Sequence, residues 1–276
     1  MRVSLFDGYG ALNSAPVFDA IQAGLDAIGI KHSNMDSSAD VAVIWSMLWA
    51  GRMKSNQQVW QHFTHTGRPV IVAEVGMLKR GVTWKLGLNG TGQDAVYNNI
   101  VPGRAESLGI VTKPWNETGY NIVIACQRSD SEQWAGQPPT VAWLTETAQT
   151  IRQYSDRPII IRPHPRERIS EIPGCYIVSP KSIPGTYDSF DYDQCLKSAW
   201  AVINWNSGPG TQAIINGVPA FVGPTSLASP VANLNLAQLE NPIRPDRTQW
   251  LDHLARTEWT IEEISTGLPL AQLLKV

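Results

Sequence analysis

The chain has 276 residues, of which 43% are hydrophobic and 17% charged, and its formal net charge is −2 at pH 7. This composition excludes a disordered chain, and the balanced charge argues against a protein whose whole surface grips a phosphate backbone. At roughly 150 residues per domain, the length fits two domains that each close a core. The three cysteines, Cys126, Cys175 and Cys195, show no C-x-x-C spacing, which predicts reduced thiols and neither disulfides nor a zinc site.

No stretch reaches the roughly 18 uninterrupted apolar residues that a membrane helix needs, and no basic segment precedes the first apolar run. We therefore expect a cytoplasmic protein without membrane contact, either a monomer or a weak dimer. No internal repeat and no charge block marks an interaction tail, so the function is expected in folded clefts.

The first half of the chain alternates short apolar runs with amphipathic ones, which is typical of βα units on a parallel sheet. The predicted strands and helices are, in order, strand 3–6, helix 16–28, strand 41–45, helix 59–66 and strand 69–73. Residues 83–89 alternate and predict a short hairpin arm. Sequence rich in Gly and Asn then continues to about residue 112.

The second half repeats this grammar. Its predicted elements are strand 122–126, helix 140–154, strand 158–162, strand 176–178, helix 192–198, strand 201–205, helix 210–216 and strand 220–222. C-terminal helices are expected at 248–255 and 261–274. Pro and Asn interrupt the pattern near 113–116, which places the domain boundary there.

The predicted fold class is therefore α/β, with two Rossmann-like doubly wound domains over 1–115 and 116–245. The C-terminal helices over 246–276 are expected to pack back over the hinge. Ligands of such sheets bind outside the carboxyl ends of the strands, so a central cleft faced by both domains is the expected site.

The most informative segment is N-W-N-S-G-P-G-T-Q at 204–212, between a buried strand and a helix. Gly208 and Gly210 let backbone N–H groups approach an anion, and the hydroxyls of Ser207 and Thr211 add donors near a helix N-terminus. The segment predicts a phosphate cradle. The alternative interpretation is a plain tight turn.

A basic loop, R-P-H-P-R-E-R at 162–168, follows a strand of the same domain. Arg162 and Arg166 offer bidentate phosphate donors, and His164 offers an imidazole that can carry a proton. Arg128, after the first strand of this half, adds a further candidate phosphate donor, and Trp134 a stacking surface. The alternatives are a solvated basic loop and a structural hydrogen bond for His164.

Two carboxylates of the first half lie at the ends of predicted strands. Glu74 follows the apolar run V-I-V-A, and Asp7 follows the first strand. A glutamate at such an edge can be desolvated enough to act as a general base, with Lys79 or Arg80 binding a charged group nearby. The alternative is a capping or ion-paired carboxylate.

Three motifs in this order resemble those of the two-domain GT-B glycosyltransferases and the related UDP-N-acetylglucosamine epimerases. They are V-A-E-V-G at 72–76 with Arg80, R-P-H-P at 162–165, and N-S-G-P-G at 206–210 with G-V-P at 217–219. The His-Pro element with a later serine turn is also similar to CMP-sugar users of this fold, the bacterial sialyltransferases and Kdo-type capsule transferases. The resemblance implies that His164 and Ser207 contact the donor phosphate and that Glu74 is an acid or base.

One departure concerns the ribose. The paired glutamates that bind it in the epimerases are replaced by residues such as Thr211, Gln212 and Ala213. The donor is therefore expected to be UDP- or CMP-linked without a choice between the two.

The leading hypothesis is a metal-independent, inverting glycosyltransferase without a cofactor. Its second domain would bind the nucleotide sugar, and its first domain would hold the acceptor, whose hydroxyl Glu74 or Asp7 deprotonates. The expected donor-binding residues are Arg128, Arg162, His164, Arg166, Ser207, Gly208, Gly210 and Thr211. The alternatives are a sugar-nucleotide epimerase or hydrolase, a glycerophosphate transferase, and a non-catalytic nucleotide- or DNA-binding module.

The phrase L-K-R-G-V-T-W-K at 78–85 resembles open reading frames of tailed phages. This resemblance implies a location in the host cytoplasm and a double-stranded DNA acceptor that carries a 5-hydroxymethylpyrimidine. Lys79, Arg80 and Lys85 would contact phosphates, and Trp84, expected in a loop, would line the acceptor cleft. The alternative is a solvated basic loop.

Overall fold

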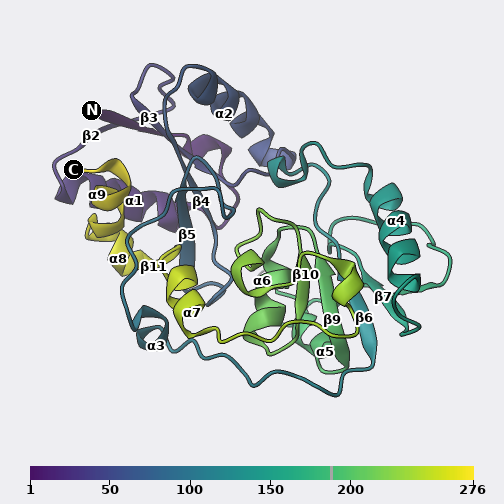
Figure 1. The fold of residues 1–276 in the computed structure, drawn as a ribbon. Helices are drawn as coiled ribbons and strands as arrows, with labels where there is room; N and C mark the ends of the chain where they lie inside the picture. The colour runs from purple at the N-terminus through teal and green to yellow at the C-terminus, as the bar shows by residue number, and fades with distance from the viewer. Residues whose placement is uncertain (187–188) are drawn as a thin grey trace. The chain divides into compact units, whose positions relative to one another are not determined.

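A computed structural model of the chain describes residues 1–186 and 189–276 (Figure 1). Unit 1 consists of Met1–Gly109, Asp130–Glu132 and Leu251–Val276, and unit 2 of Ile110–Ser129 and Gln133–Trp250. Each unit is built on one sheet with helices packed against it. The predicted fold class, α/β with two Rossmann-like units, is confirmed.

Unit 1 holds a six-stranded sheet in the order β11-β5-β4-β3-β1-β2. Its strands are β1 (Arg2–Leu5), β2 (Lys31–Asn34), β3 (Val41–Trp45), β4 (Val70–Val75), β5 (Thr83–Leu88) and β11 (Glu258–Thr260). β1 to β4 run parallel, whereas β5 is antiparallel to β4 and to β11. The three parallel strands expected from apolar runs are confirmed. β2 and β11 were not predicted, because β2 is polar (K-H-S-N) and β11 has only three residues.

Helices cover both faces of this sheet. α1 (Ala15–Ala27) packs with the C-terminal helices α8 (Ile261–Ser265) and α9 (Leu268–Leu274) on one face. α2 (Asn56–His65) covers the other face, through Val59 and Phe63. The first face encloses Trp45, whose ring lies 5.8 Å from that of Trp84.

The expected single helix over 261–274 is wrong, because the structure divides it into α8 and α9. Gly267 separates the two helices with φ +79°, which suits glycine, and Pro269 follows in the first turn of α9. A Cβ on Gly267 would lie 2.4 Å from the carbonyl oxygen of Gly24 in α1. The break therefore permits a close approach of the C-terminal segment to α1.

Unit 2 holds a five-stranded, wholly parallel sheet in the order β10-β9-β6-β7-β8. Its strands are β6 (Asn121–Ala125), β7 (Ile159–Arg162), β8 (Cys175–Ile177), β9 (Ala199–Asn204) and β10 (Ala220–Val222). The helices of unit 2 include α4 (Thr140–Arg152), α5 (Tyr192–Leu196) and α6 (Gly208–Ile215). The short helix α3 (Arg104–Ser107) belongs to unit 1, and α7 (Thr248–Ala255) begins in unit 2 and ends in unit 1. Since the strands are parallel, all their carboxyl ends lie at one edge.

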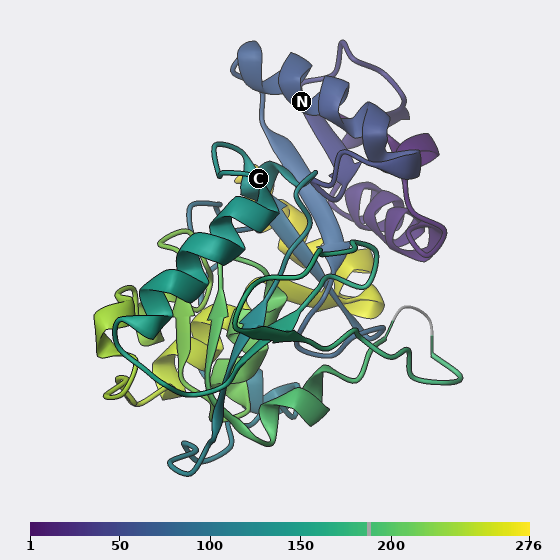
Figure 2. The ribbon, with the colours of Figure 1, turned by 90° about the vertical axis from the view of Figure 1, so that its right-hand side faces the viewer.

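The core of unit 2 lies between this sheet and α4. Leu144, Ala148 and Ile151 of α4, spaced by three or four residues, pack against isoleucines of β6 and β7. Figure 2 shows this helix in teal along the strands that it covers. In the part of the chain that the structure describes, no helix has the length and apolarity needed to cross a membrane.

Gly24 tests the packing of the C-terminal segment on α1. A Cβ at this position would lie 2.3 Å from the backbone oxygen of Ile264, so Gly24→Ala must push α8 away. We expect a loss of about 1–3 kcal/mol in the free energy of unfolding, measured by urea denaturation, although alanine is intrinsically the better helix former. Asp19→Ala, at an exposed position of the same helix, should change it by less than about 0.5 kcal/mol. A wild-type midpoint for Gly24→Ala would contradict this packing.

Candidate functional site

A buried asparagine organises the β9–α6 turn of unit 2. Asn204 is 1% exposed, and its Nδ2 donates to the carbonyl of Ala125 at 2.8 Å and to Oγ of Ser207 at 2.9 Å. Its Oδ1 accepts from the backbone N–H of Ser207 at 2.9 Å. One side chain thus links the carboxyl end of β6 to the turn after β9, and fixes Ser207 by both its backbone and its side chain.

Helix α6 begins directly after this turn. Ser207 is its N-cap residue with extended backbone, and Gly208 is its first residue. The first N–H groups of a helix have no intrahelical acceptor and carry a partial positive charge, so the turn offers donors to an anion. The hydroxyl of the half-buried Tyr192 donates to the carbonyl of Pro209 at 3.0 Å, and desolvation raises the pKa of this phenol.

Two further residues of the predicted cradle are buried. Thr211 is 1% exposed, and a Cβ on Gly210 would lie 2.9 Å from Cγ1 of Val222 and 3.2 Å from Oδ1 of Asn204. Gly210 therefore lets α6 approach β10 and the asparagine closely. Both residues therefore pack against the interior side of the turn. A contact between Thr211 and a sugar donor stays a prediction.

The His164 side chain has one ring nitrogen fixed by the loop that follows β7. Its Nδ1 accepts from the backbone N–H of Arg166 at 3.2 Å, and the N–H of Glu167 donates to its carbonyl at 2.9 Å. Because Nδ1 accepts, the neutral imidazole carries its hydrogen on Nε2. The half-buried ring is thereby set up as an Nε2–H donor.

Arg162 corrects one expectation. It was expected to donate to a phosphate, but it is 5% exposed and its guanidinium forms an ion pair with Asp191, just before α5. Burial alone would raise the pKa of the Asp191 carboxyl. The hydrogen bonds from Arg162 and from the backbone N–H of Lys181 outweigh this effect and lower that pKa below 3.8. Arg162 thus ties β7 to α5 and is already engaged.

The remaining candidates of unit 2 lie at the same sheet edge. β6 lies between β9 and β7, so the carboxyl ends of three neighbouring strands carry Ser207, Arg128 and His164. Arg128 is half-buried, and Arg166 is exposed. The structure therefore brings together, at one edge, the glycine turn and the basic loop that the sequence placed there.

In unit 1, Glu74 lies near the carboxyl end of β4 and is half-buried. Its Oε1 accepts from Oγ of Ser46 at 2.9 Å. In residues 1–186 and 189–276 this is the one hydrogen bond that its carboxylate makes. The second oxygen, Oε2, is left to accept a proton.

Asp7, the other candidate base, is exposed and already bonded through both oxygens. Its Oδ1 accepts from the backbone N–H of Gly8 at 2.9 Å, and its Oδ2 accepts from Nδ2 of Asn34 at 2.8 Å. These bonds fit a carboxylate that shapes the turn after β1 better than a base.

Two of the four expected acceptor contacts are placed otherwise. Trp84 was expected in a loop, but it lies in β5, is 8% exposed and packs on Trp45. Lys85, expected on a DNA phosphate, is 5% exposed in the same strand, directly opposite Glu74 of β4 and Glu258 of β11. The alternation of residues 83–89 indicated the strand, but not that both its faces are covered.

Lys79 and Arg80 are exposed in the turn after β4, as expected for a basic loop. The fully buried carboxylate of Glu258 holds this turn: it accepts from the N–H groups of Met77 at 2.8 Å and Leu78 at 3.1 Å. It also accepts from Oγ1 of Thr83 at 2.7 Å. The C-terminal strand β11 thus fixes the loop that follows Glu74.

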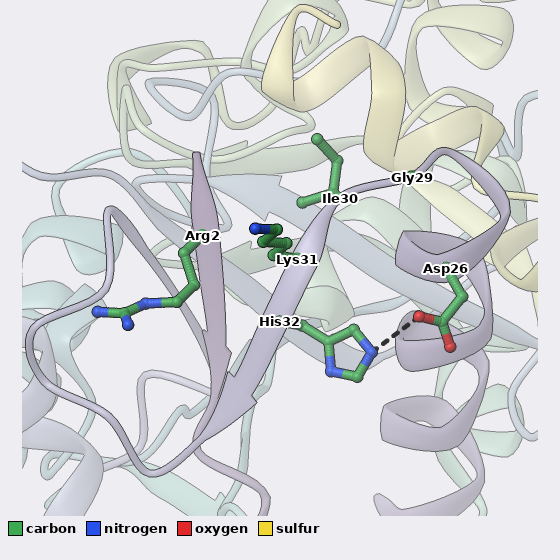
Figure 3. A pocket seen from close by; sticks show the side chains of 6 residues that line it. All are labelled: Arg2, Asp26, Gly29, Ile30, Lys31 and His32. Carbon is green, nitrogen blue, oxygen red and sulfur yellow. Dashed lines mark hydrogen bonds and ion pairs between the residues drawn. The ribbon is translucent and has the colours of Figure 1, made fainter.

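A surface hollow in unit 1 involves none of the predicted site residues (Figure 3). It lies where β1 and β2 begin, beside Arg2 and Lys31, and therefore at the amino edge of the sheet. His32 points to Asp26 of α1, with Nε2 3.0 Å from Oδ1, whereas Arg2 points the other way. Among the described residues no group of three His, Cys, Asp or Glu side chains could hold a metal ion.

The sequence did not single out three residues that organise these edges. Asn204 stood in the quoted motif without a role, although a buried Asn at a strand end is a recognisable signal. Asp191 lies 29 residues from Arg162, and Ser46 follows an apolar strand like any turn residue. No spacing rule connects either to its partner.

No protein-family model and no curated protein matches the chain. Two solved structures from Thermosulfurimonas dismutans are similar to it over nearly its whole length. KpsC described as a beta Kdo 2,4 transferase shares 11% identity with a TM-score of 0.55, covering 97% of this chain and 98% of that one. KpsC described as a beta Kdo 2,7 transferase shares 15% identity with a TM-score of 0.54, covering 100% of both. The chain therefore has the GT-B fold of these proteins.

The Arg162–Asp191 pair predicts a pH-dependent contribution to stability. The pKa of Asp191 is lower in the folded protein than in the unfolded chain. Its ionised carboxylate therefore contributes fully to the free energy of unfolding above about pH 4, and this contribution is lost as the pH falls through the folded pKa. Asp191→Asn leaves Arg162 buried without its partner. We expect it to lower the free energy of unfolding by on the order of 3 kcal/mol at pH 7, and by less below about pH 3.8. Thermal unfolding across pH measures this. The exposed Asp193→Asn is the control, and a deficit that does not change with pH would contradict the pairing.

Proposed function

We propose that the chain is a glycosyltransferase whose unit 2 binds the phosphate of a nucleotide-sugar donor. The observation that carries this proposal is the carboxyl edge of the unit 2 sheet. At this edge, Asn204 holds the turn from which α6 begins, and the Nδ1 of His164 accepts a hydrogen bond, which makes Nε2 the donor of the neutral ring. N–H donors from a helix start and an imidazole are what a phosphate oxygen requires.

Support for the donor class comes from the same edge and from the fold. The two similar structures are described as Kdo transferases, which supports a sugar as the transferred group. We propose a CMP- or UDP-linked donor. Ser207, with Gly208 and the first turn of α6, would hold the phosphate, while Arg128 and Arg166 add positive charge.

For the acceptor we propose Glu74 as the base in preference to Asp7. Glu74 is half-buried with only Oε1 hydrogen-bonded, whereas both oxygens of Asp7 are engaged. Glu74 takes the proton of an acceptor hydroxyl, and the hydroxyl oxygen forms a bond to the anomeric carbon. The bond from that carbon to the phosphate oxygen breaks, the nucleotide leaves with the electron pair, and the configuration inverts.

The acceptor itself is proposed only as a hydroxyl-bearing molecule. A modified base in double-stranded DNA was expected to use four residues, but Trp84 and Lys85 are buried in β5. Lys79 and Arg80 alone are exposed there, and two cations make a small footprint for a duplex.

A nucleotide panel tests the donor site. A ligand at about 100 times its dissociation constant stabilises the folded state by roughly 2.7 kcal/mol, so CMP, CDP, UDP, GDP or their sugar conjugates should raise the unfolding temperature. We expect His164→Ala to remove most of this shift, because it deletes the Nε2 donor. The matched control is His253→Ala at an exposed position of α7, which should keep the shift. No shift with any nucleotide would contradict the donor site.

Base function is tested separately. We expect Glu74→Gln to lower sugar transfer at least 100-fold while nucleotide binding is unchanged, since general base catalysis contributes about 10²–10⁴-fold. Asp7→Asn should transfer within about threefold of wild type. Product formation is followed by mass spectrometry with hydroxyl acceptors, including hydroxymethylated DNA. Full transfer by Glu74→Gln would exclude Glu74 as the base, and donor breakdown without acceptor would favour a hydrolase or epimerase.

A further inference from the structure

Ser46 has a backbone conformation that serine seldom adopts. It follows β3 directly with φ +61°, in the left-handed region, and is 6% exposed. Non-glycine residues in such conformations are strained, and they persist where the surrounding structure holds the backbone in place. A glycine would meet the same turn without this strain.

The groups around Ser46 leave its backbone little choice. The buried Asn56 donates from Nδ2 to the carbonyl of Trp45 at 2.7 Å. The N–H of Ser46 donates to the carbonyl of Ala73 at 2.8 Å, and the N–H of Glu132 donates to the carbonyl of Met47 at 2.9 Å. The residues before and after Ser46 are thus fixed independently of its side chain.

The backbone conformation of this turn directs the Ser46 hydroxyl toward Glu74. Oγ of Ser46 donates to Oε1 of Glu74 at 2.9 Å, across neighbouring parallel strands. Lys85 lies opposite Glu74 on the other side, in β5, but no ion pair joins the two side chains within the described residues. Ser46 is therefore the group that orients the carboxylate.

We infer that Ser46 is a positioning residue for Glu74, an inference that rests on the proposed function of Glu74 as the base. Ser46 occupies Oε1, so Oε2 is the oxygen presented to the acceptor proton. The left-handed backbone keeps Oγ in place when the acceptor binds. Glycine at position 46 would relieve the backbone strain, but it has no hydroxyl to donate to Glu74. The need for this hydroxyl explains why a strained serine stands there.

Three variants separate positioning from a merely structural turn. Ser46→Gly removes both the strain and the hydroxyl, and Ser46→Ala removes the hydroxyl but keeps the strain. Lys275→Gly is the matched control, since Lys275 also has φ +58° but ends α9 at an exposed position. We expect an unfolding temperature at or above wild type for Ser46→Gly and Lys275→Gly, and a lower one for Ser46→Ala.

Activity then decides the role. With CMP- and UDP-linked sugars as probes, both Ser46 variants should lower kcat on the order of tenfold or more with KM little changed, because a displaced base costs rate and not donor binding. Lys275→Gly should keep the wild-type kcat. Wild-type kcat in a stable Ser46→Gly, when Glu74→Gln is inactive, would overturn the inference and leave the proposed function standing. Full activity of Glu74→Gln would overturn the inference together with the proposed role of Glu74 as the base.

A second measurement does not need turnover, so it applies even if the protein consumes none of these sugar donors. Glutamate labelled with ¹³C at the side-chain carboxyl, assigned by Glu74→Gln, reports the order of this group by NMR relaxation. We expect Glu74 to lose order in both Ser46 variants and to keep it in Lys275→Gly. Unchanged order in Ser46→Gly would overturn the inference.

Discussion

The candidate edges of both sheets depend on buried amides that close the carboxyl ends of parallel strands. A parallel strand that stops in the interior leaves backbone groups that need partners, because an unpaired buried carbonyl is costly. Asn204 supplies partners for Ala125 and Ser207 in unit 2, and Asn56 supplies one for Trp45 in unit 1. Each amide lets the chain leave its strand abruptly. The turns that carry Ser207 and Ser46 have their shapes for this reason.

Charge at these edges is divided between structure and chemistry. Arg162 and Asp191 neutralise each other, and Glu258 is satisfied by two backbone N–H groups and a hydroxyl, so these groups fix loops. Glu74 differs, because Oε1 of its carboxylate accepts from Ser46 while Oε2 makes no hydrogen bond within the described residues. His164 is held through Nδ1, which places the hydrogen of the neutral ring on Nε2. A carboxylate with one engaged oxygen at a partly buried edge suits proton transfer.

Apolar runs and turn residues predicted much of this arrangement. They located every parallel strand except the polar β2, and the rule on carboxyl ends brought Ser207, Arg128 and His164 to one edge. Burial of individual side chains could not be predicted the same way. Lys85 and Trp84 lie in a strand covered by β4, β11 and packed helices, and β11 comes from 170 residues later in the chain. The pairing of Arg162 with Asp191 likewise depends on tertiary structure and on no local pattern.

The two candidate bases show how the same position at a strand end leads to different chemistry. Asp7 follows a strand whose next residues bend back as a short turn, so the Gly8 N–H and the Asn34 amide reach both oxygens. Glu74 extends from a strand that continues, and its neighbour β3 has already turned away at Ser46, so a single hydroxyl reaches it. The choice of Glu74 as the proposed base therefore depends less on the presence of a carboxylate than on how few hydrogen-bond donors the neighbouring strand leaves within its reach.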